Sequence, residues 1–303
     1  MRVRPDGVEV VPVQPGRQPE RVGEVAEALE RGTLVAGLAG HGHQRGHVAR
    51  QRVGIDDHAG SLPHFMPDGV TDRLRAEAAR RGPLTVAGSC LAWGGRYAAG
   101  RARLGRAPRT FEFDGHALRE FHHRYHYTWM NERAAELALA REVVDGVPDA
   151  DLLEVGNVLA HYIREGHTVV DRYEQAPGVI NADVVDLDLE QRFPLIVSIS
   201  TLEHVGFDED VTDPDKPARA VEHLRALLAP GGRLWATIPV GYNAEMDARV
   251  RDGRLAFDRL RALRRDSHRQ GWREVELDQV WDAEYDRLLF SATGLLVCEL
   301  GAG

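Results

Sequence analysis

Lysine is almost absent from this chain of 303 residues, in which Lys216 is the only one among 38 basic residues. Acidic residues number 47, so the formal net charge is −9. A negative surface is poorly suited to a polyanion, and nucleic acid is therefore not an expected partner. We interpret the preference for arginine as a bias of genome composition and not as a phosphate-binding device.

Cysteine and long apolar runs are also scarce. Cys90 and Cys298 are far apart in the sequence, which favours two free thiols in a reducing cytoplasm over a structural disulfide. No basic start precedes an apolar segment, so no signal peptide is expected, and no apolar run approaches the length of a membrane span. With 43% hydrophobic and 28% charged residues, the chain is expected to form a packed globular core. Together with the free thiols and the lack of membrane segments, this predicts a cytoplasmic protein that does not bind membranes.

The first third of the chain, residues 1–105, has loose patterning and is predicted to be an accessory region, a small α/β lobe or cover outside the main sheet. Its predicted elements are strands at 8–13, 33–39 and 84–87, helices at 19–32 and 68–82, and Gly-rich connectors at 37–46 and 94–105. His41, His43 and His47 have spacings that could suit zinc, but no cysteine or carboxylate pattern completes a site. A solvated His-rich loop is favoured, and no metal site is expected.

Residues 106–303 are predicted to form a second domain, whose most informative stretch is 151–162. Residues 152–155 are typical of a buried strand, Gly156 of a tight turn, and the chain from Val158 of a helix. A strand, a glycine turn and a helix N-terminus together form a notch of nucleotide size. Glycine suits such a turn because a ligand approaches the backbone closely and φ can be positive.

Three more strands are predicted to follow this turn, at 168–170, 181–187 and 193–200. Asp171 ends the first of them, where an acid is placed to accept hydrogen bonds from a ribose diol. The last leads into Ser-Thr-Leu-Glu-His-Val-Gly, residues 200–206, at the carboxyl end where ligands bind in open α/β sheets. His204 could act there as a general base, because imidazole titrates near neutrality. Alternatively, His204 begins a helix and only packs or caps.

A dense run of aromatic residues and histidines occupies residues 121–129, after a predicted hairpin at 110–116 with its turn at Asp114 and Gly115. Such a run is costly to bury without partners, and two interpretations stay open: an aromatic plug that seals the sheet edge, or the wall of a substrate pocket. Asn131 is a good N-cap for the next helix. Arg133, one turn into that helix, could form a bidentate pair with a ligand carboxylate.

The C-terminal part of the chain is predicted to complete the sheet. The strand at 233–239 leads into Gly-Tyr-Asn, residues 241–243, again at the ligand edge. The other predicted elements are an amphipathic helix at 218–228, a charged helix at 249–265, and strands at 272–280 and 294–300.

The ordered motifs resemble class I S-adenosylmethionine-dependent methyltransferases over residues 108–303. They are Leu-Glu-Val-Gly, Val-Val-Asp, Asn-Ala-Asp, Ile-Ser-Thr-Leu-Glu-His-Val and Leu-Ala-Pro-Gly-Gly. Within these enzymes the chain is most similar to a small group known as a domain of unknown function, whose members share Asn-Glu-Arg, Leu-Glu-Val-Gly-Asn-Val-Leu and Ser-Thr-Leu-Glu-His-Val-Gly. The Leu-Glu-His-Val element is also similar to one in quinone O-methyltransferases. Asn157 replaces the usual second glycine of the loop, which narrows the notch.

This resemblance implies an α/β fold, with a seven-stranded, mainly parallel Rossmann-like sheet, helices on both faces and a reversed final strand. It implies S-adenosyl-L-methionine as the cofactor. The residues implied to surround it are Arg133 at its carboxylate; Glu154, Gly156 and Asn157 at its methionine moiety; Asp171 at the ribose; Asp183 at the adenine amine; and Ser200 and Leu202 on its other side.

The resulting interpretation is a cytoplasmic methyltransferase of biosynthesis or secondary metabolism that acts on a small molecule. A hydroxyl of a sugar, nucleoside or natural-product intermediate is the expected acceptor. Such a hydroxyl loses its proton as it attacks, so a base is needed; His204 is the first candidate and His126 the second. The predicted substrate-binding residues are Tyr127, Trp129, Tyr242 and Asn243. Non-methylation chemistry with the cofactor, a non-catalytic binding role in a biosynthetic complex, and assembly as a homodimer stay open.

Overall fold

The computed structural model describes residues 70–103, 108–267 and 270–303. The elements predicted before residue 68, and the three histidines between 41 and 47, lie outside the described residues. The helices are α3 (Val70–Arg81), α4 (Pro83–Arg103), α5 (Arg133–Val144), α6 (Lys216–Ala226) and α7 (Ala244–Arg251), with 3-10 turns η1 (Tyr125–Met130), η2 (Asp149–Asp151), η3 (Leu159–His161), η4 (Leu202–His204) and η5 (Leu277–Gln279).

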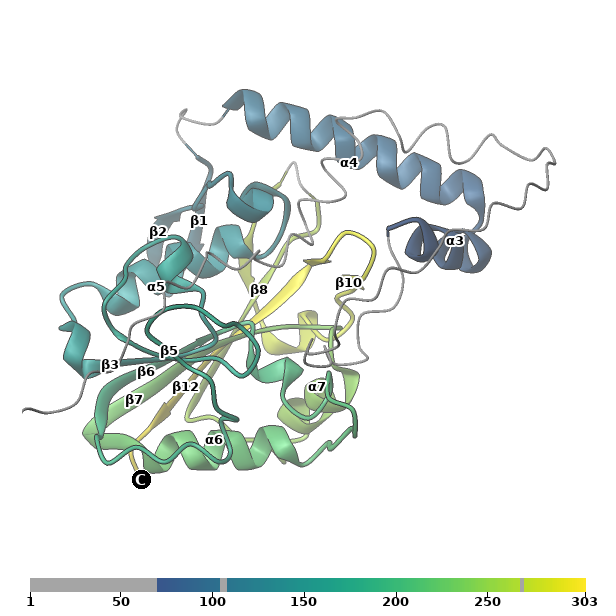
Figure 1. Ribbon diagram of the computed structural model, residues 1–303. Coiled ribbons are helices and arrows are strands. Elements are labelled where there is room, and N and C mark those ends of the chain that lie inside the picture. Colours follow the sequence, from purple (N-terminus) through teal and green to yellow (C-terminus); the bar gives the residue numbers. More distant parts are fainter. Residues whose placement is uncertain (1–69, 104–107, 268–269) are drawn as a thin grey trace, which may run out of the picture.

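A single large sheet of eight described strands forms the centre of the molecule, in the order β5-β4-β3-β6-β7-β12-β8-β9 (Figure 1). The strands from β5 to β7 are parallel, whereas β12 runs antiparallel between β7 and β8. Its strands are β3 (Leu152–Val155), β4 (Thr168–Val170), β5 (Val179–Ile180), β6 (Phe193–Ile199), β7 (Leu228–Pro239), β8 (Arg259–Arg264), β9 (Arg273–Val275) and β12 (Gly294–Gly301). The expected α/β Rossmann-like sheet with a reversed final strand is confirmed, with eight described strands instead of the expected seven.

The order of the strands reverses at β3, since the chain first moves outward through β4 and β5 and then returns to form β6 on the other side. In doubly wound sheets such a reversal opens a crevice beyond the carboxyl ends of the two central strands. The loops after β3, β4, β6 and β7 all meet at that edge, which therefore holds the candidate site.

Alternating side chains of the central strands fill two separate cores, one on each face of the sheet. In β6, Ile196 belongs to the core shared with α6 and α7, whereas Leu195 and Val197 belong to the core shared with α5. The two-residue period of a strand explains why every residue from Leu195 to Ile199 is buried. Helices thus cover both faces, with α6 below the sheet in Figure 1 and α5 above it.

The region before residue 106 differs from its predicted structure. Residues 84–87 and 94–103 were expected as a strand and a loop but lie within the single helix α4. Its buried residues include Val86, Trp93 and Tyr97, of which Trp93 and Tyr97 pack against the aromatic segment after the hairpin. Tertiary packing thus overrides the low helix propensity of several glycines. Gly100 is required there, because a Cβ would overlap the Trp129 ring.

The hairpin itself is confirmed, as β1 (Thr110–Phe113) and β2 (His116–Arg119) pair antiparallel across Asp114 and Gly115. Two further short strands, β10 (Tyr285–Asp286) and β11 (Ser291–Ala292), form a second small pair. In Figure 1, α4 crosses the top of the molecule above β1 and β2.

Four other predicted elements are wrong in type or extent. No helix begins at Val158, where only the short turn η3 forms, and the third parallel strand is residues 179–180 instead of 181–187. The predicted helix at 249–265 is instead the end of α7 followed by the strand β8. Strand β8 pairs with β12 and so provides hydrogen-bond partners for the edge of β12 that faces away from β7. The predicted strand at 272–280 shortens to β9, followed by η5.

Both cysteines are free thiols, as predicted, with Cys298 buried in β12. Among the described helices, none has the length and apolar character needed to cross a bilayer.

The central position of β6 predicts a contrast in stability between two apolar substitutions. Ile196 is fully buried, so Ile196→Ala is expected to lower the free energy of unfolding by about 2–5 kcal/mol. Leu91 on α4 is 74% exposed, so Leu91→Ala should change it by less than about 0.5 kcal/mol. Urea denaturation of both variants measures the difference, and equal losses would contradict the assigned core.

Candidate functional site

The turn after β3 is held between the tips of its two neighbouring strands. Gly156 has φ +86° and its N–H donates to the carbonyl of Val170 at the end of β4, at 2.8 Å. On its other side, a Cβ at this position would overlap the Thr201 hydroxyl beyond β6. Both the positive φ and the close approach therefore require glycine.

Glu154 supports this turn from beneath. Its side chain is fully buried, and Oε1 accepts hydrogen bonds from the amides of Val158 at 2.9 Å and Leu159 at 2.7 Å. Oε2 lies 2.8 Å from Nε2 of His167. A carboxylate bound to these amides holds the loop in a non-helical path, which explains why the predicted helix is missing. The structure thus places Glu154 under the loop.

Asp171 and Asn157 lie together at the tip of β4. Oδ1 of Asp171 accepts from the amides of Tyr173 at 2.8 Å and Glu174 at 2.7 Å, and Oδ2 accepts from the amide of Asn157 at 3.3 Å. Asn157 donates through Nδ2 to Glu174 at 2.8 Å, while its buried Oδ1 has no partner among the described residues. Glu174, which the motifs did not single out, also lies 3.0 Å from Nε2 of His161.

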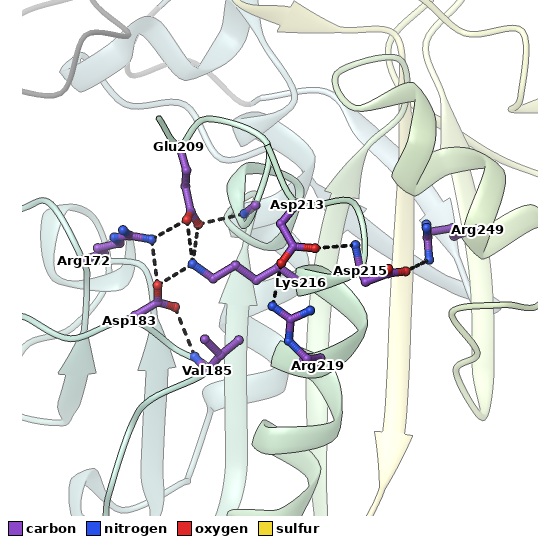
Figure 2. Close-up of polar contacts among 10 residues, drawn as sticks. Arg172, Asp183, Val185, Glu209, Asp213, Asp215, Lys216, Arg219 and Arg249 are labelled. Carbon is purple, nitrogen blue, oxygen red and sulfur yellow. Dashed lines mark hydrogen bonds and ion pairs between the residues drawn. The ribbon is translucent and has the colours of Figure 1, made fainter. Parts of the chain in front are cut away.

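Asp183 follows β5 and is part of a network of charges (Figure 2). Its Oδ2 lies 2.7 Å from Nη1 of Arg172 and 2.5 Å from Nζ of Lys216, and its Oδ1 accepts from the amide of Val185. Burial raises the pKa of Asp183, but these partners lower it by more, so the carboxyl is ionised at neutral pH. One oxygen of Asp183 therefore has capacity for a further donor.

Arg133 is the first residue of α5 and reaches the tip of β6. Its Nη1 lies 3.0 Å from Oε2 of Glu136 and 3.5 Å from the carbonyl of Ile199. The fully buried Glu136 also accepts hydrogen bonds from the hydroxyls of Ser200 and Thr237. Ser200 has φ +44°, which is costly for a residue with a side chain. Glu136 was missed in the sequence, although its spacing of three from Arg133 on a helix could have indicated the pair.

His204 lies at the end of η4 and is oriented by a carboxylate. Its Nδ1 is hydrogen-bonded to Oδ2 of Asp208, which also accepts from the hydroxyl of Tyr242. The rings of His204 and Tyr242 are 4.5 Å apart. Burial lowers the pKa of His204, but Asp208 and Glu203 raise it by more, so the pKa lies above its ordinary value. Asp208 is a further functional candidate that the motifs missed, after Glu174 and Glu136.

The residues next to His204 have structural roles. Leu202 is fully buried in the core below the loop. Asn243 caps α7 by accepting from the amide of Met246, and its Nδ2 donates to the carbonyl of Glu203 at 3.0 Å. Glu203 is 1% exposed, its Oε2 has no described partner, and burial raises its pKa to about 8.

The aromatic run divides between two surroundings. His126 stacks on Tyr125 at 4.0 Å, and Tyr125 contacts the His161 ring at 5.1 Å, so both lie near the loop after β3. Burial, Arg133 and His161 lower the pKa of His126 to about 4, which leaves it neutral. Tyr127 and Trp129, by contrast, pack against Trp93 and Tyr97 of α4. This packing is similar to that of an aromatic plug, which was the alternative interpretation of residues 121–129.

A surface hollow of about 590 Å³ lies elsewhere, between the C-terminal end of α5 and the loop at 162–164. Arg141, Asp145 and Arg164 are among the residues that line it. Phe121 and Tyr162 line it as well, so the hollow adjoins the aromatic run, whereas Gly156, Asp171 and His204 are not among its lining residues.

Comparisons with known proteins give structural likenesses only. No family model matches the chain, and no curated protein matches it. The solved N-methyltransferase NodS of Bradyrhizobium japonicum, in complex with S-adenosyl-L-homocysteine, is 15% identical, with 56% of this chain and 87% of that one covered and a TM-score of 0.34. A putative rRNA methylase of Clostridium thermocellum is 14% identical, with 55% and 97% covered and a TM-score of 0.34. Magnesium protoporphyrin IX methyltransferase of Synechocystis is 12% identical, with 55% and 78% covered and a TM-score of 0.30.

Because the turn at Gly156 is held between the tips of β4 and β6, one added methyl group there is expected to lower the free energy of unfolding strongly. Gly156→Ala combines a left-handed backbone with an overlap on Thr201, whereas Gly146→Ala has φ +69° but open space around its Cβ. We expect Gly146→Ala to cost about 1–2 kcal/mol and Gly156→Ala about 1–3 kcal/mol more. Chemical denaturation of the two variants measures both losses, and their difference is the cost of the overlap with Thr201. Equal losses would contradict the close packing of Gly156 against Thr201.

The buried Glu203 carboxyl predicts a pH dependence of stability. Its pKa is about 8 in the folded chain against an ordinary value of 4.5, so between these values the folded state binds one more proton than the unfolded state. Stability contributed by this group therefore falls as pH rises through that window. The free energy of unfolding of Glu203→Gln, relative to that of the wild type, should therefore rise with pH, by up to ~1.4 kcal/mol per pH unit between about pH 6 and pH 8.

Asp247 offers a matched control, because burial raises its pKa only to about 6. Asp247→Asn should alter the slope of stability against pH below that value and leave it unchanged above. Thermal or urea unfolding across the pH range distinguishes the two groups. A Glu203→Gln curve parallel to that of the wild type up to pH 8 would show that the carboxyl is ionised.

Proposed function

We propose that this protein is an enzyme that transfers the methyl group of S-adenosyl-L-methionine to a small-molecule acceptor. One observation carries the proposal: the glycine turn of β3 lies where the strand order reverses, beside an acid at the tip of β4. Doubly wound sheets bind nucleotide-like ligands at that point. When bound, the cofactor supplies an activated methyl group on a sulfonium, so alignment of the acceptor provides much of the rate.

The residues of the site fit this cofactor in their chemistry. Asp171 is oriented by three backbone amides and still has lone pairs that a ribose diol could use. The unpartnered Oδ1 of Asn157 is an acceptor beside the glycine turn. The guanidinium of Arg133, at the tip of β6, suits the carboxylate of the cofactor, and the remaining capacity of Asp183 suits the adenine amine.

Two histidines near the mouth of the proposed site, the edge formed by the loops after β3, β4, β6 and β7, have opposite pKa shifts. His126 is neutral above about pH 4, whereas the carboxylate of Asp208 favours the charged form of His204. For a hydroxyl acceptor, His204 remains our first candidate for the base, acting through Nε2 while Asp208 holds the proton on Nδ1. Its deprotonated fraction grows as pH rises above its pKa. His126 is the second candidate.

The acceptor itself is proposed to be a sugar, a nucleoside or a natural-product intermediate of biosynthesis. The net charge of −9 supports a small molecule over a nucleic acid. Its reacting hydroxyl would lie between His204 and His126, with Tyr242 on the far side. Because Tyr127, Trp129 and Asn243 contact other parts of the chain, their roles would be indirect.

Binding of S-adenosylhomocysteine tests the proposal. It should raise the melting temperature of the intact protein by mass action. Asp171→Ala should raise the Kd at least about tenfold, because each charge-assisted bond to the ribose contributes roughly 1.5–3 kcal/mol. Exposed Asp188 provides the control variant, Asp188→Ala, which should bind as the wild type does.

Isothermal titration calorimetry at a temperature where both variants are folded measures these constants. Absence of any heat of binding with the intact protein would rule out the cofactor and, with it, methyl transfer. If Asp188→Ala weakened binding as much as Asp171→Ala did, the ribose site at the tip of β4 would be wrong.

A further inference from the structure

The loop between η4 and α6, residues 205–215, is folded back on itself. The amide of Asp213 donates to the carbonyl of Gly206 at 2.7 Å, which closes the loop at its base. Gly206 has φ +69°, and a Cβ there would overlap the carbonyl of Asp213 and approach Lys216 to 2.8 Å. The start of the loop is therefore packed directly against the start of α6.

Two adjacent carboxylates on this loop have different partners. Asp208 is bonded to His204 and Tyr242, on the side of the proposed acceptor. Glu209 accepts from the amide of Gly206 at 2.8 Å and pairs with Nη1 of Arg172, also at 2.8 Å, next to the proposed ribose acid. The loop thus contacts both sides of the proposed site, the acceptor side through Asp208 and the ribose side through Glu209.

Lys216 joins these parts. Its ammonium group lies 2.5 Å from Oδ2 of Asp183 and 2.7 and 2.6 Å from the two oxygens of Glu209. An ammonium has three N–H donors, so this geometry uses all of them. Arg172 bridges the same two carboxylates, and the four residues form a closed ring of alternating charge, which we call the Lys216 network (Figure 2).

Three members of the Lys216 network are shielded from solvent, whereas the fourth, Arg172, is 41% exposed. The side chains of Lys216, Asp183 and Glu209 are 10, 17 and 13% exposed. The pair Arg219–Asp213, on the same helix and loop, is 52 and 37% exposed. Exposed pairs contribute little, whereas loss of one partner from a shielded network leaves charges uncompensated.

We propose that Lys216 is a positioning residue of the site: it fastens loop 205–215 to the tips of β4 and β5, and so holds Asp208 and His204 at the mouth. The inference rests on the proposed function, in which the tip of β4 binds the adenosyl group. Because Arg172 directly follows Asp171, the same network also sets the position of the ribose acid. Cofactor affinity and the surroundings of His204 therefore depend together on one ammonium group.

The first test compares Lys216→Met with the matched control Arg219→Gln. Lys216→Met should raise the Kd for S-adenosylhomocysteine roughly tenfold, since it breaks a shielded network. Arg219→Gln removes only an exposed pair and should remain within about twofold of the wild type. Lys216→Arg should rescue affinity only in part, because a planar guanidinium does not reproduce three radial donors. If Lys216→Met does not fold, Glu209→Gln breaks the same ring with the lysine retained and should also weaken binding.

The second test needs no cofactor and distinguishes positioning from general stability. Histidine ring protons, assigned with His204→Gln, report the pKa of His204 by NMR titration. The titratable and charged groups facing His204 are Asp208, Glu203, Tyr242 and Arg133. In Lys216→Met the pKa of His204 should move down from its raised value, because Asp208 is no longer held against the ring; in Arg219→Gln it should not move.

The outcomes separate the two proposals. Intact protein that does not bind S-adenosylhomocysteine contradicts the proposed function, and the NMR titration still decides the role of Lys216. Binding by the wild type, with Lys216→Met and Glu209→Gln both within twofold of it and the pKa of His204 unchanged, would overturn the inference.

Discussion

The arrangement of the strand edge depends on how three buried glutamates find hydrogen-bond partners. Glu136, Glu154 and Glu203 are each at most 1% exposed, and a buried carboxylate is costly unless donors surround it. Glu154 takes two loop amides and a histidine, so the chain after β3 follows a turn instead of a helix. Glu136 takes Arg133 and two hydroxyls, which docks α5 onto the tips of β6 and β7. Glu203 lacks comparable donors and keeps its proton.

These carboxyls lie under the loops, while a second set of charges lies across them. Asp171, Asp183 and Asp208 follow three different strands, and each is oriented by backbone amides or by a cation or histidine. The buried set determines the path of each loop, and the upper set determines how the loops approach one another. The proposed methyl transfer needs both sets of carboxyl groups, because two reactants stay aligned only when the loops that bind them keep a fixed arrangement.

Much of the central sheet could be predicted because its signals are local. The strands at 152–155, 168–170 and 193–199 are short apolar runs bounded by polar or glycine residues, and the hairpin turn at Asp114 and Gly115 depends on two adjacent residues. Helix α4 was missed because its glycines are locally unfavourable, and only contact with Trp129 and Tyr127 shows why the chain is helical there. Strand β8 was missed for a similar reason, since its charged sequence becomes a strand by pairing with β12.

The sequence by itself determined the α/β class, the glycine turn, and the order of acids and histidines along the strand tips, because each depends on residues close together in the chain. It could not determine which of those groups face one another. Glu136 beneath Ser200, Tyr242 beside Asp208, and Lys216 beside Asp183 are contacts between loops and helices that are far apart in the sequence. Only the tertiary structure brings these loops to one edge, and only there do burial and neighbouring charge decide that His126 is neutral and His204 favours its proton.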